Sequence, residues 1–254
     1  MAAPDQTFDI TVGGDRLEAA RWPGSAGAPL VLLHEGLGSV GLWRDTPARL
    51  RDATGRTALA WSRAGYGRST PCIIPRPLDY MEREAQHLPT VLDALGAEEA
   101  VLVGHSDGGS IAALAGASPR IRALVLIAPH FFVEQCSVEA IAAAREEYET
   151  GTLRERLARH HDHVDAAFRG WNDAWLSPAF RDWDITACLD RIACPILAVQ
   201  GMDDPYGTRA QVDVIARHLP VAQIHLIDSA GHAPHAERPE IVIPLLARFV
   251  GQLP

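Results

Sequence analysis

The sequence has no lysine: all 23 of its basic residues are arginines. The absence of lysine excludes chemistry through a lysine Schiff base. Positive charge is also in the minority: 32 acidic residues give a formal net charge of −9, and no basic run occurs. A protein that binds a nucleic-acid backbone needs a concentrated surplus of Lys and Arg on one face. We therefore expect no nucleic-acid partner.

Cysteines and long apolar stretches are few. The four cysteines are widely separated and form no Cys-x-x-Cys pair, so neither a zinc site nor a disulfide framework is indicated. No window offers the roughly 18 apolar residues of a membrane span, and Met1–Thr7 lacks the basic start and apolar stretch of a leader. These absences predict a cytoplasmic protein with reduced thiols and no membrane partner.

What is present is typical of a globular chain with a packed core. Apolar residues make up 47% of the 254 residues and charged residues 22%. Alternating stretches at residues 8–12 and 16–22 flank Gly13-Gly14-Asp15 and predict an opening β-hairpin. Continuous apolar runs, suited to strands buried on both faces, follow at residues 29–34, 57–62, 100–104, 121–128, 195–200 and 223–227.

Segments with helical spacing separate most of these runs, at residues 42–53, 80–95, 110–117, 209–219 and 239–249. Alternating strands and helices predict a parallel sheet wrapped by helices. Residues 130–190 have no buried-strand signal and predict amphipathic helices, so we expect a core of residues 1–129 and 191–254 with a helical cap of residues 130–190. The aromatic side chains of this insertion either line an apolar pocket or hold its helices together.

A candidate nucleophile lies in Gly104-His105-Ser106-Asp107-Gly108, between an apolar strand and a predicted helix. A nucleophilic serine needs a tight strand-to-helix turn with small residues two before and two after it. The helix N-terminus behind it also favours an anionic intermediate. We predict that Ser106 is the nucleophile.

A serine hydroxyl needs a histidine to remove its proton and a carboxylate to orient that histidine, in the chain order Ser, acid, His. Asp203 and Asp204 follow the apolar run at residues 195–200, and His232 follows the run at residues 223–227. His225 and His235 are the competing histidines. The sequence therefore supplies a complete set of partners in the expected order.

Taken together, these motifs resemble the α/β-hydrolase superfamily, in particular its small esterases and C-C hydrolases. The resemblance runs from Leu30 to the end of the chain. It is carried by the elbow around Ser106 and by Leu32-Leu-His34-Glu-Gly36, Gly65-Tyr-Gly67-Arg-Ser69, Gly201-Met-Asp-Asp204 and Gly231-His232-Ala-Pro-His-Ala-Glu237. It implies an α/β fold with a mostly parallel twisted sheet of about eight strands, helices on both faces and a helical cap insertion. It also favours Asp204 and His232 as the partners of Ser106.

The oxyanion hole is expected to use two backbone amides, that of Asp107 and, by resemblance, that of Gly36. Glu35 stands where the family usually has glycine. Burying an unpaired carboxylate is costly, so our hypothesis is that Glu35 pairs with Arg63, which follows a neighbouring strand. The alternative is that Glu35 points into solvent.

Other candidates for substrate contact are His130, at the carboxyl end of the run at residues 121–128, and Trp171 and Trp175 of the insertion, together with Glu35 and Arg63. The cluster His160-His161-Asp162-His163 has metal-ligand residue types. Adjacent residues of a helix diverge by 100°, however, so we expect a polar face of the cap and no metal.

The resemblance implies acyl transfer from a small-molecule substrate without metal or organic cofactor. The expected function is hydrolysis of a carboxylic ester, whether a small or aromatic ester, a lactone or a thioester. Alternatives with the same residues are a C-C bond hydrolase of a dienoate diketone, an amidase or imino-peptidase, and a cofactor-free perhydrolase. A non-catalytic ligand-binding member would lack one of the three residues. A monomer or a small homo-oligomer is expected.

Overall fold

The computed structural model describes residues 4–253, so the first three residues of the segment tested above for a leader, Met1–Ala3, lie outside it. Within the described residues one eight-stranded sheet has the order β1-β2-β4-β3-β5-β6-β7-β8. The hairpin of β1 and β2 is antiparallel and β2 is antiparallel to β4, whereas all other neighbours are parallel. The predicted fold class is confirmed. The strands are β1 (Gln6–Val12), β2 (Asp15–Trp22), β3 (Leu30–Leu33), β4 (Ala58–Trp61), β5 (Ala100–His105), β6 (Ile121–Ile127), β7 (Ile196–Gly201) and β8 (Gln223–Ile227).

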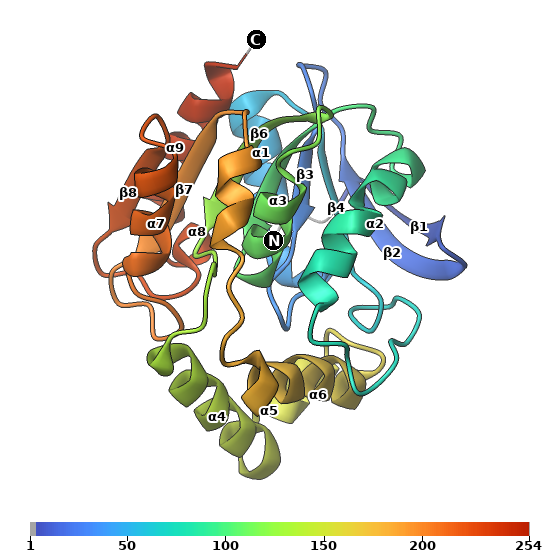
Figure 1. Cartoon of the computed structure of the whole chain (residues 1–254). Coiled ribbons are helices and arrows are strands. Elements are labelled where there is room, and N and C mark those ends of the chain that lie inside the picture. Colours follow the sequence, from blue (N-terminus) through green and yellow to red (C-terminus); the bar gives the residue numbers. More distant parts are fainter. Residues whose placement is uncertain (1–3, 254) are drawn as a thin grey trace.

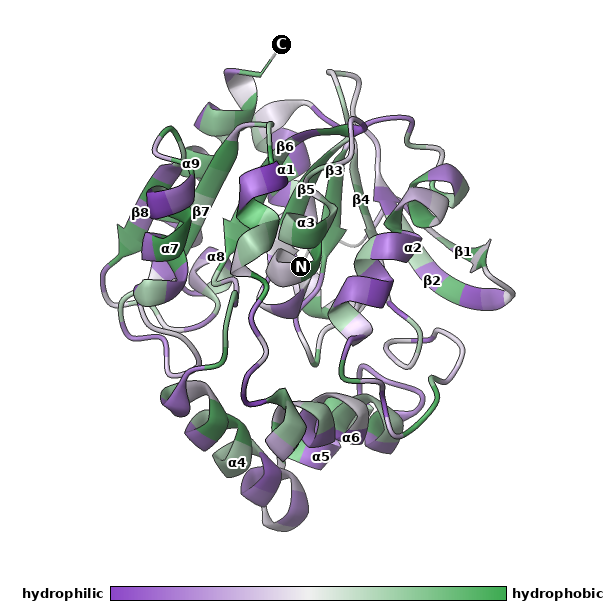
Figure 2. Ribbon diagram, in the orientation of Figure 1, coloured by the Kyte–Doolittle hydropathy of each residue, from purple (hydrophilic) through white to green (hydrophobic). Residues whose placement is uncertain are grey.

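The apolar runs form strands because both faces of the sheet are covered. Leu30 and Leu32 of β3 join one buried cluster, while Val31 and Leu33 join the other, as the two-residue period of a strand requires. The central strands are accordingly hydrophobic throughout, whereas polar residues gather on the outer sides of helices such as α2 (Figure 2).

Helices pack on both faces of the sheet. Apolar residues of α1 and α9 share one buried cluster, and those of α2, α3 and α7 share the other. The predicted helix at residues 42–53 is two pieces, η1 and α1, because Pro47 lies in the first turn of a new helix. The core helices are η1 (Val40–Trp43), α1 (Thr46–Thr54), α2 (Tyr80–Ala94), α3 (Asp107–Ala115), η3 (Thr186–Arg191), α7 (Ala210–His218), α8 (Pro234–Glu237) and α9 (Pro239–Gly251).

Most of residues 130–190 forms helices set apart from the sheet. We call α4 (Gln135–Thr150), α5 (Leu153–Ala158) and α6 (Val164–Trp175) the cap helices; they lie together beyond one end of the strands (Figure 1). An isolated bridge between Phe132 and Asp184 joins the two points where the chain leaves the core for the cap helices and returns to it. The short helix η2 (Pro178–Phe180) precedes the return. The final turn, η3, packs on α3 and α7 of the core. The cap helices therefore face the edge of the sheet where the parallel strands end.

Within residues 4–253, no helix combines the length and the apolar character that crossing a bilayer requires.

Candidate active site

Ser106 lies at the sharp turn between β5 and α3, with φ 54° and ψ −121°. Residues other than glycine rarely adopt this positive φ. The turn is possible because two neighbouring glycines let backbone segments approach closely. A Cβ on Gly104 would lie 2.2 Å from the carbonyl oxygen of Gly108, and a Cβ on Gly108 would lie 2.0 Å from that of Leu33. The turn holds the Ser106 side chain above the carboxyl end of the central strand.

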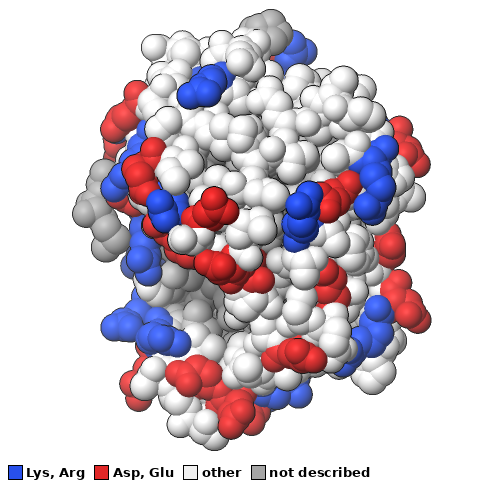
Figure 3. Space-filling view, turned by 90° about the vertical axis from the view of Figure 1, so that its left-hand side faces the viewer, with Lys and Arg blue, Asp and Glu red and all other residues white. Residues whose placement is uncertain are grey.

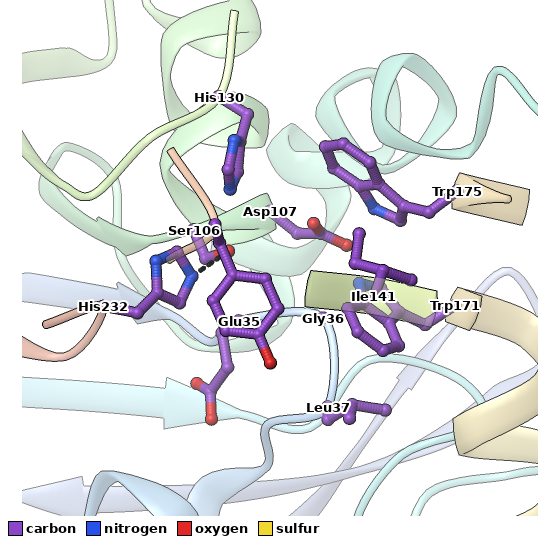
Figure 4. A pocket seen from close by; sticks show the side chains of 11 residues that line it. Glu35, Gly36, Leu37, Ser106, Asp107, His130, Ile141, Trp171, Trp175 and His232 are labelled. Carbon is purple, nitrogen blue, oxygen red and sulfur yellow. Dashed lines mark hydrogen bonds between the residues drawn. The ribbon is translucent and has the colours of Figure 1, made fainter. Parts of the chain in front are cut away.

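Three side chains from separate segments form a continuous hydrogen-bonded chain. His232 Nε2 lies 2.8 Å from Ser106 Oγ, and His232 Nδ1 lies 2.8 Å from Asp204 Oδ2. Because a carboxylate only accepts, Nδ1 carries the proton and Nε2 is left to accept from the serine hydroxyl. The bond between Ser106 and His232 is drawn in Figure 4.

Asp204 is fixed by its own loop after β7. Its carboxylate accepts from the Tyr206 amide at 2.8 Å and from Gln200 Nε2 at 2.8 Å. Burial acts to raise the pKa of Asp204, but the hydrogen bond and charge of His232 and the Tyr206 amide outweigh it, so the pKa lies below its usual value. The side chain is ionised and can stabilise an imidazolium.

The competing residues lie elsewhere. Asp203 is exposed, and His225 lies on β8. His235 is buried against the rings of Trp43 and His105. The structure therefore brings Asp204 and His232, and none of these three alternatives, to Ser106.

The predicted oxyanion donors lie beside the nucleophile. Gly36 and Asp107 both line the pocket that contains Ser106. Among the described residues neither backbone amide is paired with an acceptor of the chain, so both are free to bind a ligand oxygen.

The hypothesis of an ion pair between Glu35 and Arg63 is wrong. The Arg63 guanidinium donates to the backbone carbonyl oxygens of His34 at 2.6 Å and Glu35 at 3.1 Å, whereas the Glu35 carboxylate contacts His105 Nδ1 at 3.4 Å. The Glu35 side chain is only 28% exposed, so the solvent alternative fails as well. The reason lies in the sheet: β3 has β4 on one side and β5 on the other, and the Glu35 side chain turns toward the end of β5.

The pocket beside Ser106 is a small cavity of about 110 Å³. Of the residues predicted to contact substrate, Glu35, His130, Trp171 and Trp175 line it, and Arg63 does not. Figure 4 shows Trp171, Trp175 and Ile141 together on one side of the cavity, across from His232. Leu37, Ile141 and Tyr206 also line the cavity; no sequence motif marked them, because their position depends on how loops and cap meet.

His130 is a neutral imidazole in the wall of the cavity. Burial, followed by the charge of His232, lowers its pKa to about 3. Its Nδ1 is buried and has no hydrogen-bond partner among the described residues. Its ring lies 5.1 Å from that of Trp175 and 5.7 Å from that of His232.

Asp107 connects the cavity to a second polar cluster. Tyr80 donates to its carboxylate at 2.5 Å, and Trp175 Nε1 donates to the Tyr80 oxygen at 3.1 Å. Burial raises the pKa of Asp107, and burial together with the nearby Asp107 charge raises the pKa of Tyr80. These bonds tie the cap residue Trp175 to the helix that begins at the nucleophile.

The predicted polar face of the cap is only partly right. His160 and His163 are exposed, but His161 is 4% exposed. Its Nδ1 accepts from the Gly67 amide at 2.9 Å, and its Nε2 donates to the carbonyl oxygen of Leu37 at 2.9 Å. His161 therefore connects the cap to two core loops in its neutral form, and burial lowers its pKa. No group of three potential metal ligands occurs within residues 4–253.

Comparisons with known proteins identify the family of the chain. The model of the alpha/beta hydrolase family matches residues 30–245. The chain belongs to the alpha/beta hydrolase family. It therefore has the fold of that family, as the sequence motifs predicted.

Among relatives, the human serine hydrolase BPHL is 28% identical over 186 residues, which cover 70% of this chain and 64% of BPHL. The chain thus spans just under two thirds of that relative. RutD of Pseudomonas savastanoi pv. phaseolicola, provisionally named a carbamate hydrolase, is 30% identical over 84% of this chain and 90% of its own. The esterase EaEST of Exiguobacterium antarcticum superposes with a TM-score of 0.77 at 20% identity, over 96% of this chain and 99% of EaEST.

Proposed function

We propose that this protein is a serine hydrolase that cleaves small carboxylic esters through an acyl-enzyme. The observation that carries the proposal is the chain Ser106–His232–Asp204, with heavy-atom distances of 2.8 Å at both steps. A side-chain arrangement of this kind activates a serine hydroxyl that would otherwise be a weak nucleophile. The complete set also disfavours a non-catalytic ligand-binding role.

The proposed reaction has two halves. His232 Nε2 takes the hydroxyl proton as Ser106 Oγ attacks the carbonyl carbon, and Asp204 stabilises the imidazolium that forms. The amides of Gly36 and Asp107 bind the oxyanion until His232 returns the proton to the leaving alcohol. Water, deprotonated by His232, then attacks the acyl-enzyme, and the acid is released with Ser106 restored. These steps use only the chain's own groups and water.

The cavity favours a neutral substrate. Its lining residues include Glu35 and Asp107 but no arginine. A hollow between the core and the cap is visible in Figure 3, with acidic residues above and below it and basic residues at its left edge. A dienoate carries a carboxylate, and no basic residue lines the cavity to bind it, so we favour an ester over the C-C bond substrate. The small volume and the indole rings favour a short acyl group.

We further propose that the cap helices act as a lid over this cavity, and that the protein works in the cytoplasm as a monomer or small homo-oligomer. All four thiols are unpaired in the structure, which is the state expected in a reducing compartment. Size-exclusion chromatography with light scattering would measure the oligomeric state.

A panel of p-nitrophenyl esters from acetate to octanoate, measured beside a dienoate ring-fission product, tests the substrate class. We expect the acetate and butyrate esters to be hydrolysed fastest, and Ser106→Ala to remove this activity. Faster cleavage of the dienoate would replace the ester proposal with the C-C alternative. No turnover of any compound by the wild type would favour the non-catalytic role.

A further inference from the structure

A contact between the half-buried Glu35 and the buried His105 lies behind the loop that carries His232. Glu35 Oε2 contacts His105 Nδ1 at 3.4 Å, and His105 Nε2 lies 2.8 Å from the backbone carbonyl oxygen of His232. The His105 side chain is 5% exposed. Figure 4 shows the Glu35 side chain turned away from Trp171 and Trp175, so its carboxylate does not point toward the apolar wall of the cavity.

The contacts of His105 indicate which of its ring nitrogens carry protons. A carbonyl oxygen only accepts, so Nε2 must carry a proton in order to bond to His232. The facing Glu35 carboxylate favours a second proton on Nδ1, which would make the ring an imidazolium. Burial acts to lower the pKa of His105, but the contact with Glu35 outweighs it and raises the pKa. The same contact holds the pKa of Glu35 far below its usual value despite burial.

The surroundings leave His105 as the cation of this cluster. Burial keeps the pKa of His34 well below its usual value and lowers that of His235 to about 3, so both rings are neutral. The carboxylate of Asp204 adds a favourable charge to His105. A Cβ on Gly38 would lie 2.5 Å from Glu35 Oε2, so a glycine at this position leaves space for the carboxylate.

The loop around His232 has two independent anchors. Glu237 accepts from the amides on either side, Gly231 at 2.6 Å and Ala233 at 3.0 Å. His105 instead holds the carbonyl oxygen of His232 itself. Because this segment is irregular, these bonds set the height and the angle of the imidazole relative to Ser106.

We propose that Glu35 is a positioning residue, whose carboxylate keeps His105 doubly protonated and thereby fixes the backbone of His232 between Ser106 and Asp204. This inference rests on the proposed function, in which His232 is the general base. It gives a role to the carboxylate that replaces the usual glycine. A misplacement of a general base by a fraction of an ångström slows proton transfer with little effect on substrate binding.

The variant that tests this role is Glu35→Gln, which keeps the shape of the side chain and removes its charge. We expect kcat to fall roughly tenfold while KM changes less than twofold. Side-chain ¹⁵N NMR should show His105 doubly protonated in the wild type near pH 7 and neutral in the variant. The His105 signals are assigned by their absence in His105→Asn.

Glu237→Gln is the matched control, because it weakens the other anchor of the same loop. It should lower kcat without changing the protonation of His105. A neutral His105 in the wild type would overturn the proposal without any variant, and so would a Glu35→Gln enzyme with unchanged kcat. If the wild type hydrolyses no ester, the proposed function fails instead, and the NMR result still decides whether Glu35 charges His105.

Discussion

The cavity beside Ser106 has one wall made by loops at the strand ends and another made by the cap helices, and the two walls differ in chemistry. The first supplies Glu35, Ser106, Asp107, His130 and His232, all of which can exchange or orient protons. The second supplies Ile141, Trp171 and Trp175, which offer apolar surface. The comparison indicates that the strand-end wall sets the type of reaction and that the cap wall sets the shape of the substrate.

The largest expected effect comes from removing the support that Asp204 gives to His232 of the strand-end wall. Asp204→Asn leaves His232 without the carboxylate that orients and stabilises it, so kcat should fall roughly 10³- to 10⁴-fold with little change in KM. Steady-state kinetics on p-nitrophenyl acetate measures this. Asp203→Asn, at the exposed neighbouring residue, should retain activity within about twofold. Equal losses in the two variants would contradict the assignment of Asp204.

The two walls touch at Gly36 and Trp171. A Cβ on Gly36 would lie 2.2 Å from Trp171 Nε1, so Gly36→Ala must displace either the indole or the loop that carries the oxyanion amide. We expect kcat/KM to fall roughly 100-fold. Gly41→Ala is the control, because its Cβ meets no atom closer than 3.6 Å. If Gly36→Ala had wild-type activity, the cap wall would not be held against the strand-end wall as described.

Acid should act behind the strand-end wall, through the buried neutral His235 that packs against His105. Burial lowers the pKa of His235 to about 3, so the unfolded chain binds a proton below about pH 6.5 that the folded chain does not. Stability from this group is therefore full above pH 6.5 and is lost as the pH falls. Lowering the pH from 7.5 to 5 should therefore reduce the free energy of unfolding by about 2 kcal/mol through His235 alone.

Urea unfolding at both pH values measures this loss, and His235→Gln should reduce it by about that amount. His163→Gln, at an exposed position of the cap segment, should leave the pH dependence as in the wild type. An unchanged pH dependence in His235→Gln would show that this imidazole is charged in the folded protein.

The smallest effect should come from reshaping the cap wall. Ile141→Ala enlarges the cavity without touching Ser106 or His232, so the ratio of butyrate to acetate hydrolysis should rise roughly tenfold while acetate turnover changes little. Ile241→Ala, on the exposed side of α9, is the control. A loss of all activity in Ile141→Ala at unchanged stability would mean that the cap also takes part in the chemistry.

The strand-end wall was largely predictable from the sequence. The strands were found because continuous apolar runs are a local property, and Ser106 and His232 were found because they follow such runs directly. The start of α3 at Asp107 was missed, because Gly108 and Gly109 weaken the helical signal that reaches clear periodicity only from Ser110.

Side-chain directions in loops were not predictable. The Glu35 carboxylate has a potential partner on each neighbouring strand, and only the backbone path after β3 directs it to His105 and not to Arg63. His161 has the sequence context of an exposed helix face, but docking of the cap buries it against Gly67 and Leu37. Both outcomes depend on contacts between segments that are distant in the chain.

The central claim is that Ser106 is an activated nucleophile, and covalent labelling with a fluorophosphonate tests it most directly. Intact-mass measurement followed by peptide mapping should find one adduct, on Ser106, in the wild type and none in Ser106→Ala. An unlabelled wild type, or an adduct that persists in Ser106→Ala, would contradict the account.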